Sequence, residues 1–192
     1  MGQRMFVAIV PPEAVIDDLS DFLDARPGMR WVSPQQWHLT LAFFANVPEH
    51  RIDELAERLT TKAAKRSVFR LALAGAGAFP DPARASVLWL GVSDSDSDSV
   101  EELQSLARAA RAAGAAIGAP PDGRRFTPHL TMARLRPPLE ATRWLRVLDT
   151  YRSPSWEVAD VELVASHRGE GPGGRPRYET VAALPLRQQV SS

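Results

Sequence analysis

The chain of 192 residues contains no cysteine. This absence excludes disulfide bonds, a thiol nucleophile and zinc sites of the cysteine-rich kind. It also agrees with a reducing compartment. Any side chain that performs chemistry in this protein must therefore be a histidine, a carboxylate or a hydroxyl.

Long hydrophobic runs are missing as well. No apolar stretch approaches the roughly 20 residues that a helix needs to span a bilayer. The apolar run 5–10 ends at Pro11 and Pro12 and is too short for the hydrophobic region of a secretion signal. We therefore expect a protein without membrane association that acts in the cytoplasm, and we expect it to be a monomer.

Lysine is scarce, and the net charge is zero. The chain has 23 basic and 23 acidic residues, and only Lys62 and Lys65 are lysines. A balanced charge argues against binding of duplex nucleic acid through a broad cationic face, because such binding neutralises many phosphates. The composition therefore leaves room only for a local phosphate site.

One short phrase is present twice. Residues 38–42 read His-Leu-Thr-Leu-Ala, and residues 129–133 read His-Leu-Thr-Met-Ala. Each copy lies in an apolar run typical of a β-strand, in which successive side chains point to opposite faces. The histidine and threonine of each copy therefore share one face, and the two apolar residues after them share the other. Such a strand packs one face on a core and lines a cleft with the other.

Two His-x-Thr strands predict one active site with two histidines. Of two imidazoles that face each other, one can accept a proton while the other donates one. Thr40 and Thr131 can donate hydrogen bonds to the non-bridging oxygens of a tetrahedral anion, and phosphate fits this arrangement best. We therefore predict cleavage of a strained cyclic phosphodiester by His38 and His129, with no metal and no cofactor. The two nearly identical phrases do not assign which histidine is the acid.

The hydrophobic pattern predicts both strands and helices. Their order lacks the regular strand–helix–strand alternation of parallel sheets, so we expect the α+β class with antiparallel sheets. A turn-rich stretch, 75–84, separates two of the strands. The predicted strands are 4–10, 37–45, 68–74, 86–92, 127–135, 156–166 and 177–184, and the predicted helices are 12–25, 51–65, 100–113 and 139–150.

The two phrases lie about half the chain apart, which predicts two related lobes. We expect one domain, 1–192, with lobes 1–92 and 100–192 that flank a central cleft and can exchange strands. Each lobe would hold an antiparallel sheet and helices. The acidic, serine-rich run 93–99 reads as the linker, and Ser99 with Glu102 forms a capping box before the next helix.

These residues resemble the 2H phosphoesterases, and more closely the bacterial and archaeal RNA 2′,3′-cyclic phosphodiesterases, formerly called 2′-5′ RNA ligases. The resemblance covers nearly the whole chain. Two stretches depart from the family pattern, 165–170 and 93–99, and neither touches the motifs. Besides the two phrases, the resemblance rests on residues 4–8, 30–32, 77–80, 87–91, 126–134, 171–174 and 177–179.

The resemblance implies a bilobed α+β fold and hydrolysis of terminal 2′,3′-cyclic phosphates of RNA to 2′-phosphomonoesters. At matching positions, His38 would be the proton donor to the departing 3′ oxygen and His129 the proton acceptor that activates water. Arg134 and Phe6 would bind the substrate, the first by holding phosphate or stacking on a base and the second by stacking on a base. The implied partners are RNA 3′ ends or small cyclic phosphodiesters.

Both substrate-binding residues also have a structural interpretation. Arg134 lies five residues after His129, so strict alternation places it on the core face unless the strand bulges or ends near Ala133. For Phe6, core packing is the favoured interpretation. The glycines of 169–174 fit a plain loop better than an anion-binding nest.

Other side chains have less specific roles. His50 and His167 are expected to be solvated. Trp31 and Trp37 lie close enough to the first motif to line the cleft, whereas the remaining tryptophans are expected in the core: Trp89, Trp144 and Trp156.

Two further functions remain open from the residues. The chain could be an RNA- or nucleotide-binding module without turnover, or it could apply the same chemistry to a small cyclic nucleotide or to a 2′-5′ linkage, as a ligase does. The intact histidine and threonine in both copies favour an enzyme.

Overall fold

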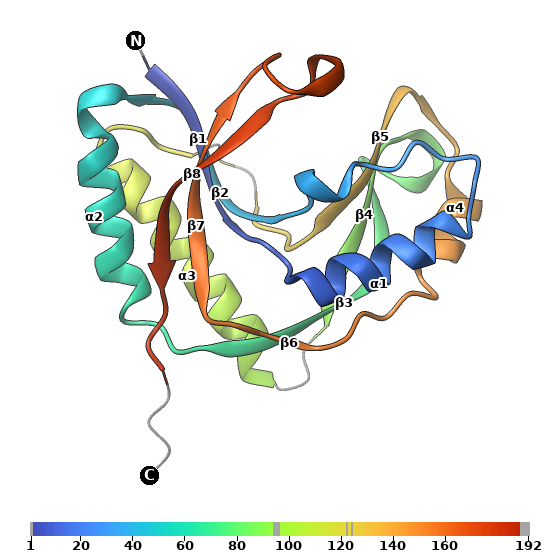
Figure 1. Cartoon of the computed structure of the whole chain (residues 1–192), viewed down its shortest axis with the longest axis horizontal. Coiled ribbons are helices and arrows are strands. Elements are labelled where there is room, and N and C mark those ends of the chain that lie inside the picture. Colours follow the sequence, from blue (N-terminus) through green and yellow to red (C-terminus); the bar gives the residue numbers. More distant parts are fainter. Residues whose placement is uncertain (1, 94–96, 122, 124, 189–192) are drawn as a thin grey trace.

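The computed structural model describes residues 2–93, 97–121, 123 and 125–188 (Figure 1). Eight strands form one sheet in the order β6-β3-β4-β5-β2-β1-β7-β8, and every pair of neighbours is antiparallel. The predicted α+β class with antiparallel pairing is therefore confirmed. The strands are β1 (Gly2–Ile9), β2 (Leu39–Pro48), β3 (Phe69–Phe79), β4 (Ala85–Ser93), β5 (Leu130–Leu139), β6 (Trp156–Val158), β7 (Asp160–His167) and β8 (Arg177–Pro185).

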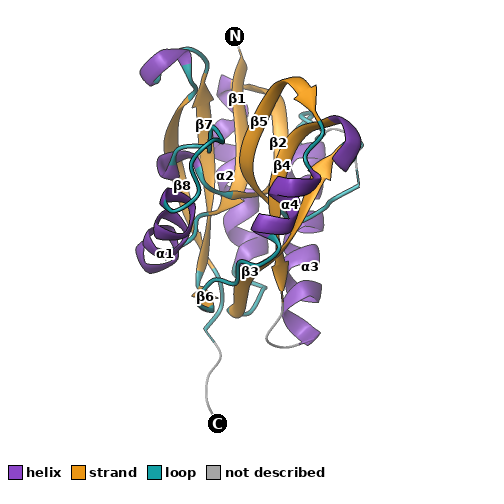
Figure 2. Ribbon diagram, turned by 90° about the vertical axis from the view of Figure 1, so that its right-hand side faces the viewer, coloured by secondary structure: helices purple, strands orange, loops and turns teal. Residues whose placement is uncertain are grey.

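The helices pack against the sheet in two pairs. Figure 1 shows α2 and α3 side by side on one side of the molecule, and α1 and α4 on the other. Figure 2 shows the strands running between these helices. Within the described residues, no helix is both long and apolar enough to cross a membrane. The helices are α1 (Glu13–Asp24), α2 (Ile52–Ala63), α3 (Ser97–Ala116) and α4 (Thr142–Leu148).

The sheet divides into two four-stranded halves that meet at the two motif strands. One half has the order β2-β1-β7-β8, and the other has the order β5-β4-β3-β6. The halves are joined where Leu39 of β2 pairs with Leu130 of β5. Each half takes strands from both segments, 1–92 and 100–192. Two lobes with those boundaries stay a prediction.

The predicted strand 156–166 is wrong as a single strand. Residues 156–158 pair with β3 at one edge of the sheet, whereas residues 160–167 pair with β1 and β8 near the other edge. The apolar pattern continues through both segments because both are buried by the same core. Periodicity alone does not show that the chain changes its pairing partner at Ala159.

The predicted turn over 75–84 is wrong in its first half, because β3 continues to Phe79. Gly75 has a φ of 77° and lies where the pairing of β3 with β4 shifts in register. Gly77 pairs with Trp89, and a Cβ at Gly77 would lie 2.0 Å from the Trp89 indole. Glycine in a strand marks a bulge and a close approach here, and not a turn.

The predicted capping box is also wrong. Helix α3 begins at Ser97, two residues before Ser99, so Ser99 lies inside the first turn and is buried. Of the expected linker, residues 94–96 lie outside the described residues. Residue 93 ends β4, and residues 97–99 begin the helix.

Candidate functional site

The two motif strands present their polar residues on one face. Paired residues of antiparallel strands point to the same side, so Leu39 and Leu130 both enter the core, where they are 1% and 0% exposed. The histidine before each leucine and the threonine after it must then point to the opposite side. The structure thus places His38, Thr40, His129 and Thr131 on a common face where the two halves meet.

Both imidazoles are held by a backbone carbonyl two residues earlier. The Nδ1 of His38 lies 2.8 Å from the Gln36 oxygen, and the Nδ1 of His129 lies 2.7 Å from the Thr127 oxygen. A carbonyl oxygen only accepts, so Nδ1 carries the proton in each ring. In the neutral form, Nε2 of each ring is then a free acceptor, and in the charged form it is a donor.

Aromatic rings enclose His38. Phe6 stacks on it with ring centroids 4.6 Å apart and an interplanar angle of 22°, and Tyr178 contacts it edge-on at 5.3 Å. Phe6 is 4% exposed. Phe6 is therefore buried, as the core-packing interpretation expected. The ring that it packs against is that of His38.

His129 has an aromatic surrounding of its own. Phe79 contacts it edge-on with centroids 5.0 Å apart, and Trp89 lies 6.0 Å away. Trp89 is half-buried beside this histidine, so its expected place in the core is wrong. Trp37 is buried and lines a small cavity that His38 also lines. Trp31 lines the cleft, so both tryptophans lie beside the first motif as expected.

The surroundings lower the pKa of both histidines. Burial lowers the pKa of His38 to about 4, with the Gln36 carbonyl acting against it and the charges of Arg134 and His129 adding to it. Burial also lowers the pKa of His129, and Arg134 adds to that effect. Both rings are therefore neutral at pH 7 in the free protein.

A bulge decides where Arg134 points. On β5, Ala133 pairs with Leu88 and Thr131 pairs with Trp89, so Met132 has no partner on β4. Met132 and Ala133 are consequently both buried, and the alternation is shifted by one residue. Arg134 thereby lies on the cleft face in spite of its odd distance from His129.

A cavity of about 530 Å³ lies beside the first motif. Its lining includes His38, Thr40, Phe6 and Arg134, but not His129 or Thr131, which lie on the adjoining strand. No carboxylate is among the described residues that line it. Six arginines do so: Arg4, Arg30, Arg134, Arg136, Arg168 and Arg175.

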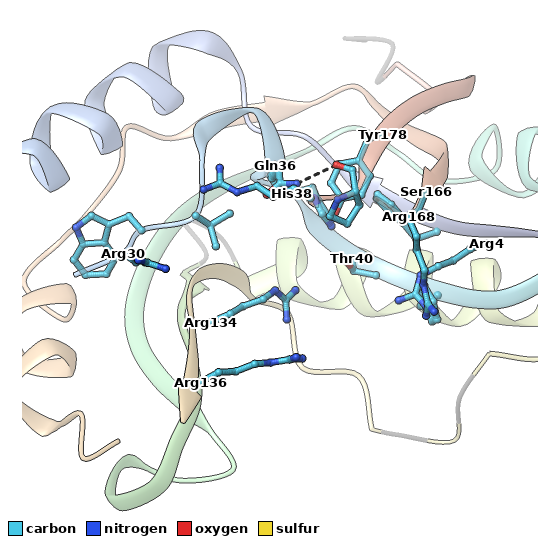
Figure 3. Close-up of a pocket in the computed structure, with 16 residues that line it drawn as sticks. Arg4, Arg30, Gln36, His38, Thr40, Arg134, Arg136, Ser166, Arg168 and Tyr178 are labelled. Carbon is cyan, nitrogen blue, oxygen red and sulfur yellow. Dashed lines mark hydrogen bonds between the residues drawn. The ribbon is translucent and has the colours of Figure 1, made fainter. Parts of the chain in front are cut away.

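The arginines reach the cavity from opposite sides. Figure 3 shows Arg134 and Arg136 extending from β5, while Arg4 and Arg168 lie together on the far side of Thr40. Burial lowers the pKa of Arg4, and the nearby charges of Arg168 and Arg134 lower it further. Cations that crowd together without a carboxylate between them form a site for an anion.

Sequence reasoning missed most of this cationic lining. Arg4, Arg30, Arg168 and Arg175 come from segments far apart in the chain, and a net charge of zero gives no sign that they converge. Tyr178 was missed as well. The only available signal was the resemblance over 177–179, which did not single out its ring.

The remaining histidines are not in this cavity. His50 is exposed, and His167 lies 3.0 Å from a carboxylate oxygen of Glu179. Within the part of the chain that the structure describes, no three histidine or acidic side chains gather as a metal site would require. The site thus combines two imidazoles with a wall of arginines.

The chain matches the family model of the 2′-5′ RNA ligase superfamily over residues 10–170. Relatives named RNA 2′,3′-cyclic phosphodiesterase include one from Geobacillus stearothermophilus, 33% identical over 173 residues, which are 86% of this chain and 50% of that protein. The chain thus spans about half the length of that relative. A relative from Aquifex aeolicus with the same name is 32% identical over 79% of this chain and 80% of its own length.

Solved structures show the same fold. The crystal structure of LigT from E. coli in its apo form superposes with a TM-score of 0.75 at 27% identity, covering 98% of this chain and 99% of that one. LigT complexed with 3′-AMP also gives a TM-score of 0.75, over 97% of this chain and 99% of that one. A Thermus thermophilus protein, TT0787, gives 0.72 at 27% identity.

Proposed function

Because this chain belongs to the 2′-5′ RNA ligase superfamily, we propose that it hydrolyses the 2′,3′-cyclic phosphate at RNA 3′ ends to a 2′-phosphomonoester. The observation that carries the proposal is the common face with two His-x-Thr pairs beside an arginine-lined cavity. The name shared by several relatives supports the substrate.

In the proposed reaction, His129 is the base and His38 is the acid. The Nε2 of His129 takes a proton from water, and the water oxygen attacks phosphorus. The bond from phosphorus to the 3′ oxygen breaks, and Nε2–H of His38 protonates that oxygen. The product keeps the phosphate on the 2′ oxygen, and proton exchange with solvent resets both imidazoles. These roles rest on the resemblance, since the backbone contacts of the two rings are alike.

The two threonines stabilise the transition state. Negative charge builds on the non-bridging oxygens as water attacks, and in this proposal the hydroxyls of Thr40 and Thr131 donate hydrogen bonds to those oxygens. Arg134 adds a guanidinium on the same face. Proton transfer and charge stabilisation are both supplied by side chains, so the proposed reaction is independent of metal.

His38 must become protonated when the substrate binds, because it acts as the acid in the proposed reaction. With a pKa of about 4, His38 is neutral at pH 7 in the free protein, and a neutral imidazole with its proton on Nδ1 has none to give at Nε2. A bound phosphodiester anion offsets the charge of Arg134 and raises the pKa of His38. The proton-loaded form therefore arises in the complex, where it is needed.

The test is incubation of an RNA oligonucleotide that ends in a 2′,3′-cyclic phosphate, with excess EDTA. We expect undiminished turnover and a 2′-phosphate product. Turnover that EDTA abolishes would overturn the two-histidine account, and a 3′-phosphate product would reverse the assigned leaving group. Binding without any turnover would identify a binding module.

A further inference from the structure

Two segments of the sheet take no part in the proposed reaction and yet border His129. They are the end of β3 and the middle of β4, and β3, β4 and β5 are consecutive in the sheet (Figure 1). Gly77 of β3 pairs with Trp89 of β4, and Trp89 pairs with Thr131 of β5. Paired residues of antiparallel strands point to the same side, so Gly77 and Trp89 lie on the cleft face with the second motif.

Glycine at position 77 leaves room for the indole of Trp89. A Cβ there would lie 2.0 Å from Cζ2 of that ring, and the next two atoms that it would meet, at 2.3 and 2.5 Å, belong to the same indole. The φ of Gly77 is not positive, so the backbone conformation does not require glycine. The side chain must be missing because the ring occupies its space.

From this position the indole joins a cluster of three rings. Its centroid lies 5.3 Å from that of Phe79 and 6.0 Å from that of the His129 imidazole. Phe79 in turn contacts His129 edge-on at 5.0 Å. Rings at these distances and in edge-on or tilted arrangements attract one another. The imidazole is therefore packed against two aromatic side chains, one from β3 and one from β4.

One hydrogen bond does not fix the plane of the imidazole. Nδ1 of His129 is held 2.7 Å from the Thr127 carbonyl oxygen, but the ring can still turn about this contact, because the outer torsion of a histidine side chain has broad energy minima. The contacts with Trp89 and Phe79 restrict that turn and thereby direct Nε2. A general base must point its nitrogen at the proton that it takes, and a displacement of about 1 Å can lower the rate about 10²-fold.

Packing places the indole of Trp89. Its Nε1 is buried, and no group within the described residues accepts a hydrogen bond from it. The position of the ring is therefore set by the shapes of its neighbours, Gly77 and Phe79 among them. A methyl group added at position 77 must displace the ring, and a displaced ring no longer supports His129.

We propose that Trp89, packed against Gly77, is a positioning residue that holds His129 in the orientation of a general base. This inference rests on the proposed function and adds a supporting residue to it. In the other half of the sheet, Phe6 stacks on His38. Each imidazole thus has an aromatic side chain that holds its ring.

The variant Trp89→Leu removes the ring and keeps an apolar side chain. We expect kcat for an oligonucleotide with a 2′,3′-cyclic phosphate to fall about 10-fold or more, since the base loses its orientation. KM should change less than about twofold, because Trp89 does not line the arginine-lined cavity. Water then approaches His129 more closely, so an NMR titration should show its pKa rising toward 6.5. Trp89→Phe keeps a ring and should restore most of the rate.

A double-mutant cycle tests whether Gly77 acts through Trp89. Gly77→Ala displaces the indole and should lower kcat as Trp89→Leu does. When both changes are combined, the loss should not exceed that of Trp89→Leu alone, because the ring atoms that the methyl group would meet are gone. Two controls should retain kcat and the pKa of His129. They are Gly123→Ala, where a Cβ meets nothing within 4 Å, and Trp156→Leu, which removes a buried indole on β6 outside the cavity.

An unchanged kcat in Trp89→Leu overturns the inference and leaves the proposed function intact, and so do losses that multiply when the two changes are combined. If circular dichroism shows that Trp89→Leu does not fold, Gly77→Ala against Gly123→Ala makes the same comparison. If the wild type hydrolyses no cyclic phosphate, the proposed function fails instead. The ring signal of His129, one of four histidines, then still decides the inference. An unshifted signal and pKa in Trp89→Leu would show that the indole does not hold the imidazole.

Discussion

The two halves of the sheet share a backbone plan and differ in their charges. In both, the residue after the motif threonine is an unpaired bulge, Leu41 on β2 and Met132 on β5. Three residues after the threonine, each strand therefore turns a side chain to the cleft face. That side chain is Phe43 in the first half and Arg134 in the second.

The two histidines also differ in the side chains that surround them. His38 is stacked on a ring and has the larger pKa shift, whereas His129 has only edge-on or tilted ring contacts. A repeated backbone thus places two equal imidazoles, and unequal neighbours set how readily each takes a proton. The repeated phrase explains why there are two similarly held histidines, and the neighbours give the two rings different surroundings.

Removal of either imidazole is expected to lower activity more than any other change. We expect His38→Ala and His129→Ala each to lower kcat by about 10²- to 10⁴-fold, because each removes one proton transfer. Single-turnover hydrolysis of a cyclic-phosphate oligonucleotide measures the loss, and thermal unfolding checks that the fold remains. His50→Ala is the matched control, since His50 is exposed and outside the cavity. Activity like that of the wild type in either variant would show that the repeat is structural.

The threonines test whether both halves contact the same phosphate. We expect Thr40→Val and Thr131→Val to lower kcat by similar factors, about 10²-fold each, because each removes one donor to the charged oxygens without a change of shape. Thr60→Val on α2 serves as the control. A loss in Thr40→Val with none in Thr131→Val would place the phosphate wholly in the first half, beside the cavity that Thr40 lines.

Arg134 is the cation by which the halves differ. We expect Arg134→Gln to raise KM about tenfold, because a charged hydrogen bond to phosphate is lost. The same change should raise the pKa of both histidines in the free protein, since the guanidinium lowers both. Histidine ring signals in an NMR titration measure this shift, with Arg108→Gln on α3 as control. Unchanged pKa values would exclude an electrostatic role of Arg134 at the two rings.

Much of the site could be predicted from the sequence, because successive side chains of a β-strand point to opposite faces. The repeated phrase predicted that His38, Thr40, His129 and Thr131 share a face, and the pairing of Leu39 with Leu130 places them so. The family resemblance is confirmed by the match over 10–170. Both inferences need only the alternation of a strand and the presence of motifs.

What the sequence could not show depends on contacts between distant segments. The bulge at Met132 has no sequence signal, since Leu-Thr-Met-Ala reads as unbroken alternation, and it decides the position of Arg134. The change of partner at Ala159 is likewise a property of the whole sheet. The cationic cavity forms from arginines that are spread over the chain in balance with acids elsewhere.

The smallest expected effect is on stability, and it compares the two histidines directly. The pKa of His38 falls from 6.5 to about 4 on folding, so between these pH values the unfolded chain binds a proton that the folded chain does not. The free energy of unfolding contributed by this group is full above pH 6.5 and declines as the pH falls toward 4, by ~1.4 kcal/mol per pH unit at most. His38→Phe keeps a stacked ring without a titrating group, so it should flatten this decline. His129→Phe should flatten it less, because the pKa shift of His129 is smaller. Urea unfolding at pH 7 and pH 5 measures both slopes, and equal flattening by the two variants would show that the halves bury their histidines to the same degree.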